Sequence, residues 1–334
     1  MARLQLSYAG HLSDRVQDLY YGAVRPEAID LHFLPLQPFE AFKRLLAGEF
    51  HCGEMSFSTW VIRCAQAKVS GDALPFVGVP AFPSRTFRHN AIYVNRKAGI
   101  KRPADLAGRR VGVPEFQMTA AVWARGMLQH EYGVKATDIH WVTGGLKDAG
   151  RKAMLEISIP GLDIRHEERK TLNDMLMSGE IEALIAPQLH PAIREGRDEV
   201  GYLFDDPASA AREYYRKTRL FPLMHVLVLR REVYEQHPWA AVSLYQAFCL
   251  AKNNALARLE VEEPPPVSLP WLYNFSEDIR ALMGRDFWPY GIEPNRREIE
   301  ALCGYVHEQG LTSLRLAPED LFAPSVTRLA EYRL

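Results

Sequence analysis

The sequence predicts an α/β protein of two lobes, each a mixed sheet flanked by helices, with a ligand cleft between them. Segments in which apolar and polar residues alternate, as in half-buried strands, are interleaved with segments that have the periodicity of amphipathic helices. Residues 90–96 and 221–231 are long enough to cross between lobes, and a first lobe interrupted by an inserted second lobe requires two such crossings. The length of 334 residues also suits two domains.

Strands and helices alternate from the start of the chain. Before the first crossing, we expect strands at residues 3–10, 29–36 and 74–82. The segment that starts at residue 52 is expected to begin with the end of another strand, the third along the chain. The helices expected between them cover residues 14–21, 38–50 and the part of 52–66 that follows the third strand. Ser13 or Asp14 suits the N-cap of the first helix, Gly48 the C-cap of the second, and Ser58 or Thr59 the N-cap of the third.

The second lobe is expected between the two crossings. A short surface helix at 103–108 precedes a buried strand at 109–114, and a short loop then leads into a helix that opens near Thr119. The unpaired N–H groups and the dipole of such a helix N-terminus make a pocket for an anion. The elements expected after it are a strand at 139–145, a helix at 171–179 and a strand at 182–187.

The remainder of the chain reads as largely helical. A long helix is expected at 237–259, followed by a Pro-rich loop at 262–270 and by helices to the C-terminus. These assignments divide the chain into a discontinuous first lobe, residues 1–91 plus 225–334 with a helical C-terminal part, and an inserted second lobe, residues 92–224.

Composition excludes several classes of function. Lys plus Arg (40) nearly equals Asp plus Glu (41), so no overall charge attracts the chain to nucleic acid or to a membrane surface. The chain begins MARLQLSYAG, in which polar residues interrupt any apolar run of an export signal, so we expect a cytoplasmic protein. Cys52, Cys64, Cys249 and Cys303 have no zinc-type spacing, and we expect them to be buried free thiols.

The segment DLAGRRVGV followed by a Thr-headed helix resembles the second lobe of type II periplasmic-binding-protein folds. Over essentially its whole length, the chain most resembles the 4,5-dihydroxyphthalate decarboxylase family. The segments that carry this resemblance are CGEMSFSTW (52–60), FPSRTFRHNAIYVN (82–95), DLAGRRVGVPEFQMTAAVWARGML (105–128), SGEIEALIAP (178–187) and FPLMHVLVLRREVYEQHPW (221–239). The resemblance implies decarboxylation of 4,5-dihydroxyphthalate to protocatechuate and carbon dioxide in phthalate breakdown.

That reaction sets requirements for a site. Direct loss of carbon dioxide to an aryl anion is prohibitively uphill, so the ring carbon that bears the departing carboxylate must first accept a proton. The hydroxyl para to that carbon supplies electrons once a base removes its proton. The site therefore needs a general base, a proton donor and cations for the retained carboxylate. It needs no organic cofactor, because the phenol is the electron source.

Arginine is the expected carboxylate holder, because its planar fork binds a carboxylate through two hydrogen bonds. Arg85 and Arg88 stand just ahead of the first expected crossing, where the lobes meet, and Arg125 lies in the Thr119 helix. Further side chains are expected to contact the substrate: the hydroxyls of Ser56, Ser58 and Thr119, the amide of Gln117 and the carboxylate of Glu115. Phe57, Trp60, Phe116 and Trp123 either pack in the core or sandwich the ring.

Histidine is the natural acid or base near neutral pH. His11, His89, His190 and His225 follow strands or stand at the expected crossings, and Glu54 near the end of the third strand is placed to act as a base or to orient a histidine. An alternative is that His190, His225 and Glu54 chelate a divalent ion, although no metal-binding motif supports it.

Two other functions remain open at the level of the sequence. A sensor or binding protein for an aromatic carboxylate would share the arginines and the Thr119 helix but would not need acid–base histidines. Another enzyme on the same scaffold is the second alternative. The expected partner is a small aromatic carboxylate, with no nucleic acid and no membrane, and the helical C-terminal third offers a surface for a homo-oligomer.

Overall fold

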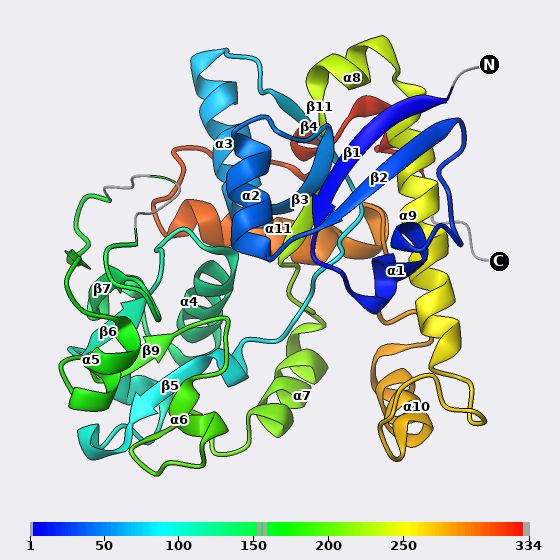
Figure 1. Cartoon of the computed structure of the whole chain (residues 1–334). Coiled ribbons are helices and arrows are strands. Elements are labelled where there is room, and N and C mark those ends of the chain that lie inside the picture. Colours follow the sequence, from blue (N-terminus) through cyan, green and yellow to red (C-terminus); the bar gives the residue numbers. More distant parts are fainter. Residues whose placement is uncertain (1–2, 152–154, 156–158, 330–334) are drawn as a thin grey trace.

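The computed structural model describes residues 3–151, 155 and 159–329, and its strands form two separate sheets (Figure 1). The five-stranded sheet has the order β2-β1-β3-β11-β4. Its strands are β1 (Leu4–Gly10), β2 (Ile29–Pro35), β3 (Cys52–Ser56), β4 (Phe76–Val79) and β11 (His225–Arg230). β1 pairs in parallel with β2 and β3, whereas β11 runs antiparallel between β3 and β4.

The six-stranded sheet has the order β10-β5-β9-β6-β7-β8 and is also mixed. Its strands are β5 (Ile92–Asn95), β6 (Arg110–Val113), β7 (His140–Gly144), β8 (Ile164–Glu167), β9 (Ala183–Ile185) and β10 (Val200–Tyr202). β5 is antiparallel to both of its neighbours, and the other pairs are parallel. Two mixed sheets with flanking helices confirm the predicted fold class. The edge strands β8 and β10 were not predicted, because each is short and one has the polar sequence IRHE.

The predicted crossing strands are wrong in their position. β5 lies wholly within the second sheet and β11 wholly within the first. The chain crosses instead through irregular residues just before β5 and β11, which lie side by side: the Thr86 N–H donates to the Pro222 carbonyl at 3.2 Å, and the Met224 N–H donates to the Ser84 carbonyl at 2.8 Å. Residues 92–95 are all buried within the second sheet, and periodicity alone does not say to which sheet a strand belongs.

Helices cover both sheets, and α11 joins the two parts. The helices next to the first sheet in the chain are α1 (Asp14–Tyr20), α2 (Pro38–Leu46), α3 (Phe57–Ser70), α8 (Arg231–Gln236), α9 (Trp239–Arg258), α10 (Leu272–Met283) and α11 (Arg296–Glu308). Those next to the second sheet are α4 (Thr119–Tyr132), α5 (Leu172–Ser178), α6 (Pro191–Arg194) and α7 (Pro207–Thr218). α11 packs against both α3 and α4 (Figure 1).

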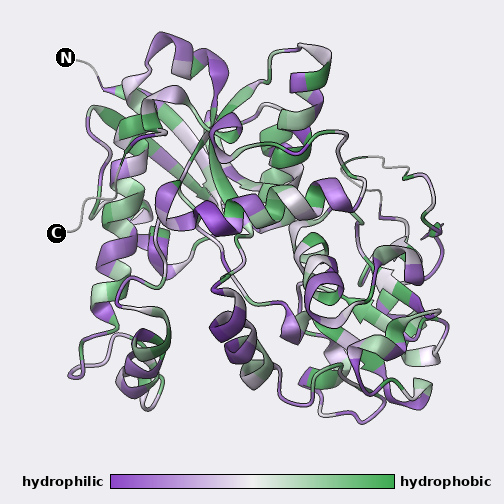
Figure 2. Ribbon diagram, turned by 180° about the vertical axis from the view of Figure 1, so that it is seen from behind, coloured by the Kyte–Doolittle hydropathy of each residue, from purple (hydrophilic) through white to green (hydrophobic). Residues whose placement is uncertain are grey.

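The distribution of hydrophobic residues explains why the helices pack on the sheets. Hydrophobic residues gather on the strands and on the helix faces turned toward them, and hydrophilic residues lie on the outward faces (Figure 2). α4 and α11 approach so closely that a Cβ on Gly126 would lie 2.2 Å from the Tyr305 ring. Within the described ranges, no helix combines the length and the hydropathy needed to cross a bilayer.

The start of α3 differs from the prediction. The helix begins at Phe57 with Ser56 as its N-cap, and no side chain caps it. The hydroxyls of Ser56 and Ser58 contact residues of α4 and the loop before it, across the lobes, and the Ser56 hydroxyl also accepts a hydrogen bond from the Thr59 hydroxyl of its own helix. Residues 1–2 and 330–334 of the predicted first lobe lie outside the described residues.

Candidate functional site

Glu54 and His225 form a hydrogen-bonded pair where β3 ends and the neighbouring β11 begins. The Nδ1 atom of His225 lies 2.8 Å from Glu54 Oε2. Ser56 is opposite His225 in the ladder, so the side chains of Glu54, Ser56 and His225 share one face of the sheet. Glu54 is 2% exposed, whereas the His225 side chain retains 15% of its exposure. A buried carboxylate thus supports an imidazole that reaches solvent.

Two more donors contact the Glu54 carboxylate. The Tyr8 hydroxyl donates to Oε1 at 3.2 Å, and the backbone N–H of His11 donates to the same oxygen at 3.1 Å. The His11 side chain is exposed beside the pair. No local pattern in the sequence points to Tyr8, because the register of β1 against β3 cannot be read from either strand alone.

Hydroxyl groups link the N-termini of α3 and α4 across the lobes. Ser56 Oγ lies 2.8 Å from Thr119 Oγ1, and the Ser58 N–H donates to that same threonine oxygen at 3.1 Å. The Ser58 hydroxyl donates to the Gln117 carbonyl at 2.5 Å. The three residues predicted to bind a carboxylate are therefore brought together, and here they satisfy one another.

The loop before α4 carries a second polar cluster. The Gln117 side-chain amide donates to Glu115 Oε2 at 2.8 Å, and Arg151 forms an ion pair with Glu115 Oε1. The Arg151 guanidinium also stacks on the ring of Phe39 in α2, 3.9 Å from its centroid, and so spans the lobes. Arg151 was not predicted as a site residue, because nothing local marks a residue 36 positions away from its partner.

Arg88 is a buried cation without a carboxylate partner among the described residues. Its guanidinium contacts the Met224 sulfur, at 2.6 Å from one nitrogen and 3.2 Å from another. Burial lowers the pKa of Arg88 to about 10, so the group stays protonated at neutral pH. Met224 directly precedes His225 in the chain, so Arg88 and Glu54 contact consecutive residues at the start of β11. An anionic ligand would supply the missing charge.

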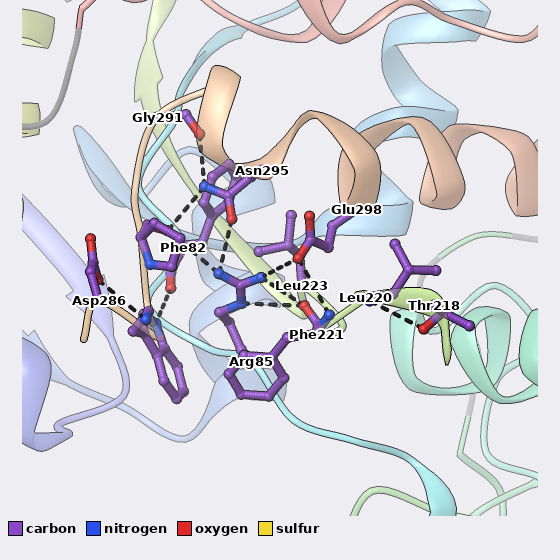
Figure 3. A network of polar contacts seen from close by, with 12 residues as sticks. Phe82, Arg85, Thr218, Leu220, Phe221, Leu223, Asp286, Gly291, Asn295 and Glu298 are labelled. Atoms are coloured by element: carbon purple, nitrogen blue, oxygen red, sulfur yellow. Dashed lines mark hydrogen bonds and ion pairs between the residues drawn. The ribbon is translucent and has the colours of Figure 1, made fainter. Parts of the chain in front are cut away.

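Arg85, predicted to bind substrate together with Arg88, is engaged elsewhere (Figure 3). Its guanidinium donates to Glu298 Oε1 and to Asn295 Oδ1 at 2.9 Å each, and to the Phe221 carbonyl at 2.8 Å. Burial lowers the pKa of Arg85, and the Glu298 carboxylate opposes that shift. We therefore treat Arg85 as a structural residue that ties both crossing segments to α11.

Arg125 also has a structural environment. Its side chain is buried between α4 and α11, donates to Gln309 Oε1 at 2.9 Å and to the Phe116 carbonyl at 2.5 Å, and stacks on the Phe116 ring. Through its contact with Phe116, Arg125 supports the loop that bears Glu115 and Gln117. The aromatic residues considered as a ring sandwich, Phe57, Trp60, Phe116 and Trp123, are at most 3% exposed and pack in the core.

His89 and His190 are not joined to the Glu54–His225 pair by any contact among the described residues. His89 is 1% exposed, has no hydrogen-bond partner for either ring nitrogen, and lies against Phe204 and Tyr214. Burial lowers its pKa to about 4, so the ring is neutral at pH 7. The Nδ1 atom of His190 accepts the Ala192 N–H at 3.2 Å and caps α6, and burial lowers its pKa.

The candidate metal ligands are not brought together. Glu54 and His225 are in contact, but His190 caps α6, and the described residues contain no group of three His, Cys, Asp or Glu side chains arranged to hold a metal. All four cysteines are free and buried, as predicted. Two cavities of about 610 and 580 Å³ lie near Arg85 and Phe221, and neither is lined by Glu54, His225 or Arg88.

Comparisons with known proteins identify relatives of this chain. The chain is 40% identical to the 4,5-dihydroxyphthalate decarboxylase of Comamonas testosteroni over 97% of its own length and 98% of the relative's. It is 38% identical to the enzyme of the same name from Pseudomonas putida, over 65% of this chain and 83% of the relative. Residues 64–159 match the family described as NMT1/THI5 like.

Solved structures show the same fold at low identity. The periplasmic aliphatic sulphonate binding protein SsuA from Escherichia coli superposes with a TM-score of 0.54 at 12% identity, covering 97% of this chain and 99% of that one. The putative sulfonate-binding SsuA of Methylobacillus flagellatus gives 0.55 at 12% identity, covering 97% and 92%. These likenesses concern the fold alone.

Proposed function

Because the chain belongs to the 4,5-dihydroxyphthalate decarboxylase family, we propose that it removes one carboxylate from 4,5-dihydroxyphthalate, giving protocatechuate and carbon dioxide. The observation that carries the proposal is the Glu54–His225 pair, and the buried cation of Arg88, which contacts the residue that precedes His225, supports it. An acid–base pair beside a carboxylate holder is what the reaction requires.

His225 is the proposed general base. Because a carboxylate only accepts hydrogen bonds, the contact with Glu54 places the imidazole hydrogen on Nδ1 and leaves the Nε2 lone pair to accept a proton. That proton comes from the ring hydroxyl para to the departing carboxylate. Glu54 then stabilises the imidazolium that forms, as a buried carboxylate does in other acid–base pairs.

Electrons released by the hydroxyl move into the ring carbon that bears the departing carboxylate, and this carbon accepts a proton. The bond to the carboxylate then breaks, carbon dioxide leaves, and its electron pair restores the aromatic ring. The phenolate takes back its proton from His225. We assign protonation of the carbon to His11, whose exposed side chain starts one bond from the N–H that contacts Glu54.

Substrate binding falls to Arg88 and to groups from both lobes. Arg88 is proposed to hold the retained carboxylate, which would replace the weak contact with the Met224 sulfur. Ser56, Ser58 and Thr119 are proposed to donate to a carboxylate once it displaces their contacts with one another. Glu115 and Gln117 are proposed to contact the ring hydroxyls. Closure of the lobes would then exclude water.

The test is the ultraviolet spectrum of 4,5-dihydroxyphthalate over time with the purified, chelator-treated protein. Conversion to protocatechuate with release of carbon dioxide supports the proposal, and addition of divalent ions then tests whether a metal takes part. Phthalate, which lacks the hydroxyls, is the matched control and should not react, because it has no electron source. Binding of 4,5-dihydroxyphthalate without turnover would favour a sensor.

Three further expectations belong to the proposal. No organic cofactor is required, since the phenol supplies the electrons. We place the reaction in the cytoplasm, in keeping with the free thiols of all four cysteines. Assembly into a homo-oligomer stays a prediction, which light scattering of the purified protein would test.

A further inference from the structure

Tyr8 is a buried residue of β1 to which the reaction above gives no role. Its side chain is fully buried, and its ring packs against Phe33 and Phe248 with centroids 4.6 and 5.4 Å away. A phenylalanine would fill the same apolar space. The hydroxyl therefore needs its own explanation, and its contact is Glu54 Oε1 at 3.2 Å.

The hydroxyl completes the set of donors around the Glu54 carboxylate. Oε1 accepts from Tyr8 and from the His11 N–H, and Oε2 contacts His225 Nδ1. Burial, and then the charge of Glu54, raise the pKa of Tyr8 well above its ordinary value. Tyr8 thus stays protonated and acts only as a donor toward this carboxylate.

Gly10 shows how closely the two groups meet. It follows Tyr8 by two positions, on the same face of β1. A Cβ at Gly10 would lie 2.3 Å from the Tyr8 hydroxyl oxygen and 2.8 Å from Glu54 Oε1. The strand therefore has no side chain at the point where the phenol meets the carboxylate.

We infer that Tyr8 is a positioning residue for the reaction: its hydroxyl fixes one oxygen of Glu54 so that the other holds His225 with Nδ1 protonated. Tyr8 acts through Glu54 and does not touch the substrate. The effect on turnover rests on the proposed function, whereas the effect on the His225 imidazole does not.

The first test is Tyr8→Phe, which removes only the hydroxyl. Loss of a hydrogen bond to a charged group should lower kcat about tenfold, with KM unchanged. Tyr305→Phe, a buried tyrosine packed on Trp123, is the matched control and should keep the wild-type kcat. In a Glu54→Gln background Tyr8→Phe should have much less effect, because both substitutions disturb one interaction. An equal loss of kcat in both backgrounds would contradict the inference.

Gly10→Ala is a second variant with an intact Tyr8. Its methyl group must displace the hydroxyl or the carboxylate, so kcat should fall at least as far as in Tyr8→Phe. Wild-type kcat in Gly10→Ala with an unchanged melting temperature would count against the close contact.

A ¹⁵N spectrum of the His225 imidazole, assigned with His225→Gln, provides a readout without substrate. Wild-type protein should show the Nδ1–H tautomer, and Tyr8→Phe should show a mixture. A protein that fails to convert 4,5-dihydroxyphthalate but shows this change would overturn the proposed reaction and support the role of Tyr8. An unchanged tautomer in Tyr8→Phe overturns that role, whatever the protein does to the substrate.

Discussion

Arg85 and Arg88, three residues apart, show how the surroundings of a side chain decide its role. Both guanidinium groups are buried and both have a pKa lowered by that burial. Arg85 donates to a carboxylate, an amide oxygen and a carbonyl, whereas Arg88 contacts only the sulfur of Met224 among the described residues. A buried cation without a counter-ion is costly to the unbound protein, and a carboxylate ligand relieves that cost.

Arg88→Ala should therefore weaken substrate binding and leave the fold intact. Removing the partner of a buried carboxylate costs about 2 kcal/mol or more, so KM should rise about 30-fold or more. Steady-state kinetics with 4,5-dihydroxyphthalate measure the effect, and Arg102→Ala, on an exposed arginine between β5 and β6, is the control. An unchanged KM would remove Arg88 from the site.

The buried side chain of His89 should make the stability of the protein depend on pH. Its pKa of about 4 in the folded protein lies below the value of about 6.5 in the unfolded chain. Between these values the unfolded chain binds more protons, so stability falls as the pH falls through this window. His89 alone should cost about 2 kcal/mol between pH 7 and pH 5.

His89→Leu should remove that part of the acid sensitivity, because leucine fills the apolar site without a titrating group. Urea unfolding at pH 7 and pH 5 measures it. His32→Leu, on an exposed histidine, should leave the difference between the two pH values as in wild type. An equal loss in His89→Leu and wild type would show that His89 does not titrate in this window.

At the scale of elements, the N-termini of α3 and α4 meet through hydroxyl groups. The sequence placed Glu54 near the end of the third strand, with Ser56 and Ser58 after it, and the predicted start of a helix near Thr119 is confirmed. What the sequence did not show is that Thr119 Oγ1 contacts both Ser56 and Ser58 of the other lobe. The two helix starts thus form one polar surface between the lobes.

Thr119→Val keeps the shape of the side chain and removes its oxygen. The Ser58 N–H and the Ser56 hydroxyl then lose a buried partner, which should lower the free energy of unfolding by about 1–3 kcal/mol. KM should also rise, since a proposed donor to the carboxylate is lost. Chemical denaturation and kinetics measure the two effects. Thr143→Val, on a less buried threonine of β7, is the control, and a stability equal to wild type in Thr119→Val would contradict this account.

At the scale of the whole molecule, α11 holds the two crossings together. Glu298 accepts from Arg85 of the first crossing and from the Phe221 N–H of the second (Figure 3). The side chains of this ion pair are 1% and 9% exposed. One helix, α11, therefore holds both crossing segments, and any movement of one lobe relative to the other takes place about this junction.

Glu298→Gln should destabilise the protein without changing KM, because it leaves the Arg85 charge buried and unpaired. The expected loss is about 3 kcal/mol in the free energy of unfolding. Glu293→Gln breaks an exposed pair with Arg296 next to the same helix and should cost less than about 1 kcal/mol. Equal stabilities of the two variants would show that the buried pair does not secure the junction.

The class of fold, the order of most strands and helices, and the family follow from the sequence alone, because periodicity, helix signals and motifs are local. The sequence also predicted Glu54, His225 and Arg88 as members of a site. Which candidates meet depends on the folded chain. Glu54 contacts His225 and Tyr8, Arg85 pairs with Glu298, and His89 lies against aromatic rings. These outcomes depend on strand register and on contacts between residues far apart in the chain, which no local pattern encodes.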